Sequence, residues 1–358
     1  MAGSPYASAL GRLKPDFPAF LPKEMYASLL AAKDTTDLAK VLETTPYADD
    51  VAWARTTHPG PSMLEIAINR TFVRRNRHAY DATPFAGRPV IAAYLGRWDI
   101  QNIELILSSK AQSRAVTETE DHLVSSRDIP AGLYSGVMTL DDFRILLGQP
   151  TVEATVTALV QYGYGTTILP FLDAFQRTHD IFAILHALDR QYYRSVLEAA
   201  RFFQGDEWVV RGLIASEIDA RNALLILKAK GADLTIDEVL SRWLEGGTIA
   251  ASQAPELYSA RTVPELADRF SGSFPSIGEG TADFTTYATL TGYEAVILRD
   301  RALYELKRLR TYPLSLSVIF TYLLLNELER GDLHRIAFGK LYGLANDRLA
   351  PLLASPRA

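Results

Sequence analysis

A short pattern of polar and apolar residues occurs three times in this chain, at intervals of a little over one hundred residues. Each copy has an acidic residue, an Asn or Asp three positions later, apolar residues at offsets 4, 7 and 8, and a Lys at offset 11. The copies run from Asp99 through Asn102 to Lys110, from Asp219 through Asn222 to Lys230, and from Glu329 through Asp332 to Lys340. These offsets select one face of an α-helix. Because each interval is about a third of the 358 residues, the pattern predicts a tandem triplication of a helical module.

Two further markers accompany each copy of this pattern; the nearer one keeps register with it, and the farther one is less evenly spaced. An Asn or Asp followed by Arg stands 29 or 30 residues ahead of each copy, at Asn69, Asp189 and Asp300. Further upstream, Asp34, Thr139 and Thr262 each precede an acidic residue by three positions, which is typical of a helix N-terminus. Each module is therefore predicted to contain a short capped helix followed by a long helical hairpin.

The predicted hairpins have recognisable breaks and ends. The breaks are expected at Pro84 and Pro89, at Gly205-Asp206 and at Pro313, because proline lacks an N–H and clashes with the preceding turn. Gly231 and Gly343 are expected to cap the ends of the second and third hairpins. The Lys at the end of each pattern is expected to face the negative helix end. We predict an all-α fold of three pseudo-symmetric domains, residues 1–115, 116–235 and 236–358.

Composition restricts the possible functions. Apolar residues make up 48% of the chain and charged residues 22%, which indicates ordered domains with substantial cores. The net charge of −5 is not that of a nucleic-acid binder, and the absence of cysteine excludes disulfides and thiolate metal sites. No apolar signal-peptide core and no stretch of about 20 apolar residues is present. We expect a soluble, cytoplasmic protein.

The sequence contains no motif for catalysis or cofactor binding. It has neither a Gly-x-x-x-x-Gly-Lys-Ser/Thr loop for phosphates nor a Gly-x-Gly-x-x-Gly turn after a strand pattern. Its six histidines form no His-x-x-x-His pair. We therefore expect no catalytic residues, no metal site and no cofactor, and we expect the chain neither to bind nor to hydrolyse ATP.

The repeated acidic and amide positions have two interpretations. They could form three equivalent ligand sites, or they could be buried polar pairs that hydrogen-bond across to the other arm of each hairpin. Catalytic sites are rarely triplicated at equal spacing, whereas packing devices of a repeat must be. We favour the structural interpretation, which concerns six residues: Asp99, Asn102, Asp219, Asn222, Glu329 and Asp332.

A basic stripe in the first module also has two interpretations. Arg70, Arg74 and Arg77 recur at helical spacing. They could form the solvated face of an amphipathic helix, which is the commoner case. They could instead dock against an acidic partner surface.

Three stretches of the chain resemble the C subunit of the V/A-type (archaeal-type) ATP synthases, whose eukaryotic relative is the d subunit of the vacuolar ATPase. The N-terminal segment from Tyr6 to Glu24 is similar to the opening of that family. Val41 to Tyr47 resembles its Leu-x-x-Thr-Pro-Tyr signature. The run from Tyr312 to Asp332 resembles its C-terminal helix. Together these stretches span nearly the whole chain.

The resemblance implies a non-catalytic rotor part. In that family three helical domains surround a central cavity and form a funnel. The funnel rests on the membrane-embedded proteolipid (c/K) ring, receives the central shaft, and transmits torque for coupled proton or sodium transport. The resemblance thus implies the ring and the shaft as partners, and a peripheral position on the cytoplasmic face of the membrane.

Two other classes of function remain as alternatives. A free-standing helical adaptor would also be repetitive, although solenoid repeats usually have 20–50 residues and stack linearly. An all-helical enzyme is the third possibility.

Overall fold

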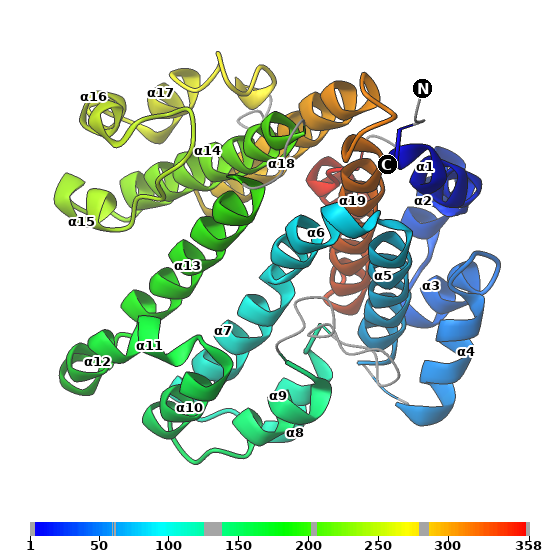
Figure 1. The fold of residues 1–358 in the computed structure, drawn as a ribbon, viewed down its shortest axis with the longest axis horizontal. Coiled ribbons are helices and arrows are strands. Elements are labelled where there is room, and N and C mark those ends of the chain that lie inside the picture. The colour runs from blue at the N-terminus through cyan, green and yellow to red at the C-terminus, as the bar shows by residue number, and fades with distance from the viewer. Residues whose placement is uncertain are drawn as a thin grey trace. The chain divides into compact units, whose positions relative to one another are not determined.

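The protein is described by a computed structural model that covers residues 4–58, 60, 62–124, 138–201, 206–278 and 286–355, with side chains in the last range from residue 290 (Figure 1). All regular structure in these ranges is helical, and no strand occurs in them. The predicted all-α class is confirmed.

The chain divides into two compact units. One contains Leu42–Gln204, and the other combines Met1–Val41 with Gly205–Ala358. The boundary near residue 205 falls inside the second predicted domain, between the two arms of its hairpin. The division into three domains and their arrangement as a funnel stay predictions.

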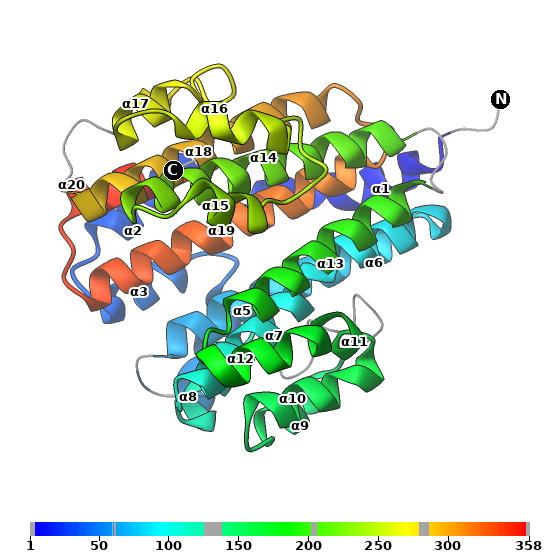
Figure 2. The ribbon, with the colours of Figure 1, turned by 90° about the vertical axis from the view of Figure 1, so that its left-hand side faces the viewer.

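The unit of Leu42–Gln204 is built around the first predicted hairpin. Its helices are α4 (Ala48–Thr57), α5 (Met63–Ala82), η2 (Phe85–Gly87), α6 (Arg88–Leu95), α7 (Arg97–Ala111), α8 (Val116–Asp121), α9 (Leu140–Leu147), α10 (Val152–Leu159), η4 (Val160–Tyr162), α11 (Gly165–Ile168), η5 (Leu169–Phe171), α12 (Leu172–Thr178) and α13 (Phe182–Arg201). Helix α4 packs on α5, and α13 packs along α6 and α7. Figures 1 and 2 both show α13 beside these two helices.

The other unit has a core of three long helices. Its elements are α1 (Tyr6–Leu13), η1 (Lys14–Ala19), α2 (Lys23–Ala31), α3 (Thr35–Leu42, ending one residue past the boundary), α14 (Glu207–Gly231), α15 (Ile236–Ser241), η6 (Ala251–Gln253), α16 (Ala254–Tyr258), α17 (Val263–Asp268), α18 (Thr286–Arg310), α19 (Ser317–Leu341), α20 (Asn346–Leu349) and η8 (Ala350–Leu352). Helix α18 packs on both α14 and α19. The short helices α15, α16 and α17 pack on α14 (Figure 2).

Buried ionic contacts hold α14 and α18 together. Arg301 on α18 donates to the Glu217 carboxylate on α14 at 3.0 Å, and both side chains are largely buried. Arg308 donates to the Val209 carbonyl at 3.1 Å. A Cβ at Gly212 would stand 2.8 Å from the Arg308 guanidinium, so the missing side chain makes room for this arginine.

The three helix-start signatures have the predicted geometry. The Asp34 carboxylate accepts the amide N–H of Asp37, and the Thr139 and Thr262 hydroxyls accept those of Asp142 and Glu265. The break at Pro313 lies between α18 and α19 as predicted. The second arm of the first hairpin differs from the prediction, because Gly96 divides it into α6 and α7.

Helices α7, α14 and α19 carry the repeated pattern and end in the same way. A residue with positive φ stands 14 positions after the acidic residue of each copy, at Ser113 (55°), Asp233 (53°) and Gly343 (68°). The next amide N–H then reaches a carbonyl five residues back, from Arg114 to Ser109, Leu234 to Ala229 and Leu344 to Gly339. This is the bonding of a Schellman C-cap. The prediction for Gly343 is confirmed, but that for Gly231 is wrong, because α14 continues through Gly231 and Asp233 takes the left-handed position.

Two glycine substitutions test this end geometry. Gly343 has positive φ and Gly11 lies inside α1, and a Cβ at either position would have no neighbour within 4 Å. Gly343→Ala should lower the free energy of unfolding by about 1–2 kcal/mol, because alanine is strained in the left-handed region. Gly11→Ala should raise it by about 0.5–1 kcal/mol through lower chain entropy. Urea unfolding measures both, and a change of the same sign in the two variants would refute the capping role.

Candidate functional site

In the first two copies, the Asn three positions after the acidic residue hydrogen-bonds the main-chain N–H and C=O of one residue 22 positions later. On α7, the Asn102 side chain accepts the Val124 amide N–H at 2.8 Å and donates to the Val124 carbonyl at 3.3 Å. On α14, Asn222 accepts the Leu244 amide at 3.0 Å and donates to its carbonyl at 2.8 Å. Both Asn side chains are buried. Each therefore satisfies a donor and an acceptor of the main chain that water cannot reach.

The third copy uses a carboxylate with correspondingly different partners. Asp332 on α19 accepts the amide N–H groups of Ala354 and Ser355, each at 2.8 Å, and pairs with Arg335 at 3.0 Å. A carboxylate only accepts hydrogen bonds. Asp332 therefore binds two main-chain N–H groups and an arginine, whereas each Asn binds one main-chain N–H and one main-chain carbonyl. Burial raises the pKa of Asp332, while these bonds and Arg335 act in the opposite direction.

These contacts correct one part of the structural interpretation. The predicted partner was the other arm of each hairpin, but the observed partner is the segment that returns after the C-cap and a short helix. We call the three contacts, Asn102 with Val124, Asn222 with Leu244, and Asp332 with Ala354 and Ser355, the return anchors. No pattern in the sequence marks the returning segments, because main-chain groups of any residue type can be bound.

The acidic residue of each copy also accepts hydrogen bonds from another segment. Asp99 accepts the buried Tyr164 hydroxyl at 3.4 Å, and burial together with the nearby carboxylate raises the pKa of Tyr164. Asp219 accepts the amides of Thr248 (3.1 Å) and Ile249 (2.9 Å). Glu329 accepts the amide of Leu21 at 2.6 Å.

The Lys of each copy binds carbonyl oxygens of a distant segment instead of its own helix end. Lys110 donates to the carbonyls of Leu147 (2.7 Å) and Gln149 (2.5 Å), and Lys230 donates to that of Tyr258 at 3.3 Å. Lys340 donates to the Leu30 carbonyl at 2.5 Å and to the Asn346 side chain at 2.6 Å. Burial lowers the pKa of Lys110 and of Lys340. The repeated acidic, amide and Lys positions therefore join each long helix to loops or to the C-terminal ends of other helices.

The basic stripe on α5 is only partly a solvated face. The buried Asp50 carboxylate on α4 accepts Arg70 at 3.0 Å, Arg74 at 2.9 Å and the Thr71 hydroxyl. The Arg70 guanidinium also lies 4.1 Å from the centre of the Trp53 ring. Arg70 is thus largely buried and fixes α4 on α5. Arg74 is 47% exposed and Arg77, paired with Asp81 at 2.8 Å, is 44% exposed.

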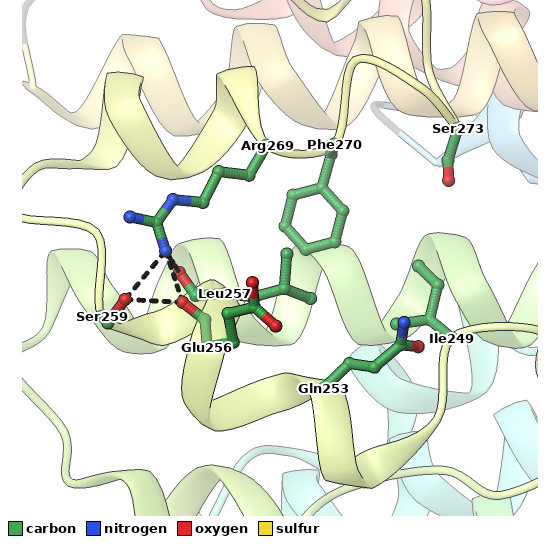
Figure 3. Close-up of a pocket in the computed structure, with 8 residues that line it drawn as sticks. All are labelled: Ile249, Gln253, Glu256, Leu257, Ser259, Arg269, Phe270 and Ser273. Carbon is green, nitrogen blue, oxygen red and sulfur yellow. Dashed lines mark hydrogen bonds between the residues drawn. The ribbon is translucent and has the colours of Figure 1, made fainter.

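One pocket, of about 590 Å³, lies beside α16 and α17 (Figure 3). Its arginine, Arg269, is already occupied, since the guanidinium donates to the Leu257 carbonyl (3.3 Å), the Ser259 hydroxyl (2.9 Å) and Glu265 (3.0 Å). Gln253, Glu256 and Ser273 complete the polar lining. The pocket joins no nucleophile to a base, and its strongest polar group serves to hold the two helices together.

Neither a metal cluster nor a membrane span is found in the part of the chain that the structure describes. No group of three or more His, Asp or Glu residues there is placed to hold a metal ion. None of the helices there combines the length and apolar character that crossing a bilayer requires.

The return anchors are tested by two neighbouring positions on α7. Asn102 is buried while Gln101 is exposed. Asn102→Leu should lower the free energy of unfolding by about 1–3 kcal/mol, because it leaves the Val124 amide and carbonyl buried without partners. Gln101→Leu is the matched control and should change it by about 0.5 kcal/mol or less. Equal urea midpoints for the two variants would show that the anchor contributes nothing.

A pH dependence is expected from the His122–Glu65 pair. His122 Nδ1 lies 2.5 Å from the Glu65 carboxylate, and this hydrogen bond raises the pKa of His122. The stabilisation is complete below the ordinary His pKa of about 6.5 and is lost as the pH rises through the raised value. Since His122 is 44% exposed, the loss should stay below about 1 kcal/mol. Urea unfolding across neutral pH should show this decrease in the wild type and not in Glu65→Gln; an identical slope in both would contradict it.

The comparisons with known proteins agree across nearly the full length of the chain. Residues 17–351 match the model of the family described as ATP synthase (C/AC39) subunit. The C subunit of the A-type ATP synthase of Thermoplasma acidophilum is 32% identical over 350 residues, which cover 98% of both chains. That of Thermoplasma volcanium is 32% identical over 97% of this chain and 98% of its own, and that of Haloferax volcanii 26% identical over 87% of each. The chain therefore belongs to the ATP synthase (C/AC39) subunit family.

Proposed function

We propose that this chain is a non-catalytic rotor subunit of a V/A-type rotary ATP synthase, which links the membrane-embedded proteolipid ring to the central shaft. The observation that carries the proposal is the full-length similarity to the C subunits of A-type ATP synthases. In this role the chain transmits torque for coupled ion transport and lies on the cytoplasmic face of the membrane.

The chemistry of the repeated positions supports a mechanical role. The six polar residues that recur along the chain are committed to main-chain amides, main-chain carbonyls or a buried tyrosine hydroxyl. Side chains engaged in this way hold segments in place and are not free to bind a substrate. The catalytic chemistry is accordingly assigned to other subunits of the complex.

Long, internally braced helices suit the transmission of torque. Helices α14, α18 and α19 each have 25 residues, a length of about 37 Å, and α18 packs on both of the others. The three tandem domains of residues 1–115, 116–235 and 236–358 belong to the same proposal. Equivalent domains related by rotation about an axis could surround a shaft.

Within the basic stripe, the proposed partner contact is restricted to Arg74 and Arg77. Their side chains are about half exposed. The Arg77–Asp81 pair lies at the surface, where ion pairs contribute little, so Arg77 can exchange Asp81 for an acidic group of another subunit. Arg74 stays paired with the buried Asp50 and presents the exposed part of its side chain. Arg70 is left out because its own side chain is largely buried, in contact with the Asp50 carboxylate and the Trp53 ring.

The proposal is tested by binding of the full chain to the purified ring and to the purified shaft subunits at low and high salt. The wild type should bind both. Arg74→Glu with Arg77→Glu should weaken one of the two complexes, and more so at low salt, because rim charges act through long-range attraction. A wild type that binds neither partner would refute the rotor role and favour the adaptor. If the double variant binds with wild-type affinity at both salt concentrations, the stripe is not part of the interface, and the rotor role stands.

A further inference from the structure

The C-terminal half of α18 presents an exposed side that is both apolar and basic. Leu303 is 45% exposed and Tyr304 is 62% exposed, and Lys307 and Arg310 are exposed as well. Leu303, Lys307 and Arg310 stand at positions i, i+4 and i+7, so they form one row along the helix, and Tyr304 lies beside Lys307 at i−3. We call these four residues the open face.

The open face lies on a different side of α18 from its contacts with α14. Arg301 donates to the Glu217 carboxylate of α14, and Arg308 donates to the Val209 carbonyl of the same helix. Helical spacing puts Arg301 and Arg308 roughly 150° around the helix from Leu303. The side of α18 that binds α14 therefore leaves the open face to solvent.

The two cations of the open face are not compensated in the described ranges. Neither Lys307 nor Arg310 forms an ion pair there, and α19 contributes no acidic residue before Glu327. The nearest acid on the same side is Asp300, seven positions before Lys307. It is 8% exposed and accepts the Ser276 amide N–H at 2.7 Å.

The other acidic residues of α14 and α18 already have partners. The pairs are Asp206 with the Leu316 amide, Glu207 with Arg211, Glu217 with Arg301, Asp219 with the Thr248 and Ile249 amides, Glu294 with Lys228, and Glu305 with Arg308. The open face is thus a positive surface on a chain whose net charge is −5.

The first two repeats bury the positions that correspond to the apolar part of the open face. Counting is from the second marker of each repeat, at Asn69, Asp189 and Asp300. The counterparts of Leu303 and Tyr304 are Phe72 and Val73 on α5, and Tyr192 and Tyr193 on α13. All four counterparts are at most 5% exposed. Exposure of these positions is therefore peculiar to the third repeat.

A helix covers the counterpart positions in both earlier repeats. The Phe72 ring packs edge to face on Trp98 of α7, with centroids 4.8 Å apart. The Arg97 guanidinium of α7 donates to the Tyr192 hydroxyl at 2.6 Å, and α13 packs along α6 and α7. The same positions of α18 have no such cover in the described ranges, which indicates a surface shaped to receive a helix.

The charged positions of the open face indicate the chemistry of that helix. The counterparts of Lys307 and Arg310 in the covered repeats are uncharged: Asn76 and Ala79 on α5, and Val196 and Ala199 on α13. A helix that lies on the open face meets two cations about one turn apart instead. The complementary helix carries carboxylates about one turn apart, next to apolar side chains.

We propose that the open face is the docking surface for an acidic α-helix of the central shaft. Carboxylates of that helix pair with Lys307 and Arg310, and its apolar side chains cover Leu303 and Tyr304. The proposal rests on the proposed function, which gives this chain the ring and the shaft as partners. The shaft is the one selected, because the spanning helices of a membrane-embedded ring have their sides in the bilayer and offer mainly turns to a soluble protein.

The test measures binding of the full chain to the purified shaft subunits at low and high salt. Lys307→Glu with Arg310→Glu, and separately Leu303→Ala with Tyr304→Ala, should each weaken this binding about tenfold or more. The loss in the charge variant should be larger at low salt. Binding to the detergent-solubilised ring should not change.

A matched control reverses two charges on the first arm of the second hairpin. Arg194→Glu with Arg201→Glu alters two exposed positions of α13 and should bind the shaft like the wild type. Thermal melts of the free chain should give the same midpoint for the wild type, the control and both open-face variants, because the open face is a solvated surface before the shaft binds.

The contrary outcomes separate this proposal from the rotor role. If both open-face variants bind the shaft like the wild type, or lose the ring and keep the shaft, the open face does not receive the shaft, while the rotor role stands. If they lose only binding to phosphatidylglycerol vesicles, the open face meets lipid and the proposal is wrong. If the open-face variants melt well below the control, the chain itself covers the open face, which also overturns the proposal. If the wild type does not bind the shaft, the proposal is wrong, and if it binds neither shaft nor ring, the rotor role fails as well.

Discussion

The return anchors are the interaction on which the rest of the fold depends. A helix of up to 25 residues ends in a C-cap, a short helix follows, and the chain then comes back to the middle of the long helix. The returning main chain is buried there, and an unpaired amide or carbonyl in such a place costs about as much as a lost hydrogen bond. One side chain, at Asn102, Asn222 or Asp332, removes that cost. The length and direction of each return are fixed as a consequence.

The third copy of the pattern is completed by the N-terminal segment. In the first two copies, the acidic residue and the Lys bind segments that follow them in the sequence. In the third copy, Glu329 and Lys340 bind Leu21 and Leu30, more than 300 residues earlier. Phe17 and Phe20 pack their rings against Tyr322 of α19, and α1 lies along the same helix. The N-terminal segment thus supplies for α19 the partners that downstream segments supply for α7 and α14.

Local features could be predicted from the sequence, because they depend on residue type at fixed spacing. The helical face around Asn102, the cap at Thr139 and the turn at Pro313 all follow from local chemistry. Which segments meet could not be predicted. Nothing in the residues near Val124 marks them as the partner of Asn102, since only main-chain atoms are bound. The burial of Arg70 escaped prediction for a similar reason: helical spacing placed it on a charged face, but the buried Asp50 that engages it comes from α4, twenty residues away.

The contacts of residues 4–31 with α19 have a consequence for biosynthesis. These residues leave the ribosome long before α19, the helix on which they pack, because about 300 residues separate the two segments. The unit of Leu42–Gln204 is complete in the nascent chain before α19 is translated. Residues 4–31 must therefore wait while the middle of the chain folds. During that interval the apolar faces of α1 and α2, with Tyr6, Leu13, Tyr26 and Leu29, have no native surface to cover them and are candidates for chaperone binding.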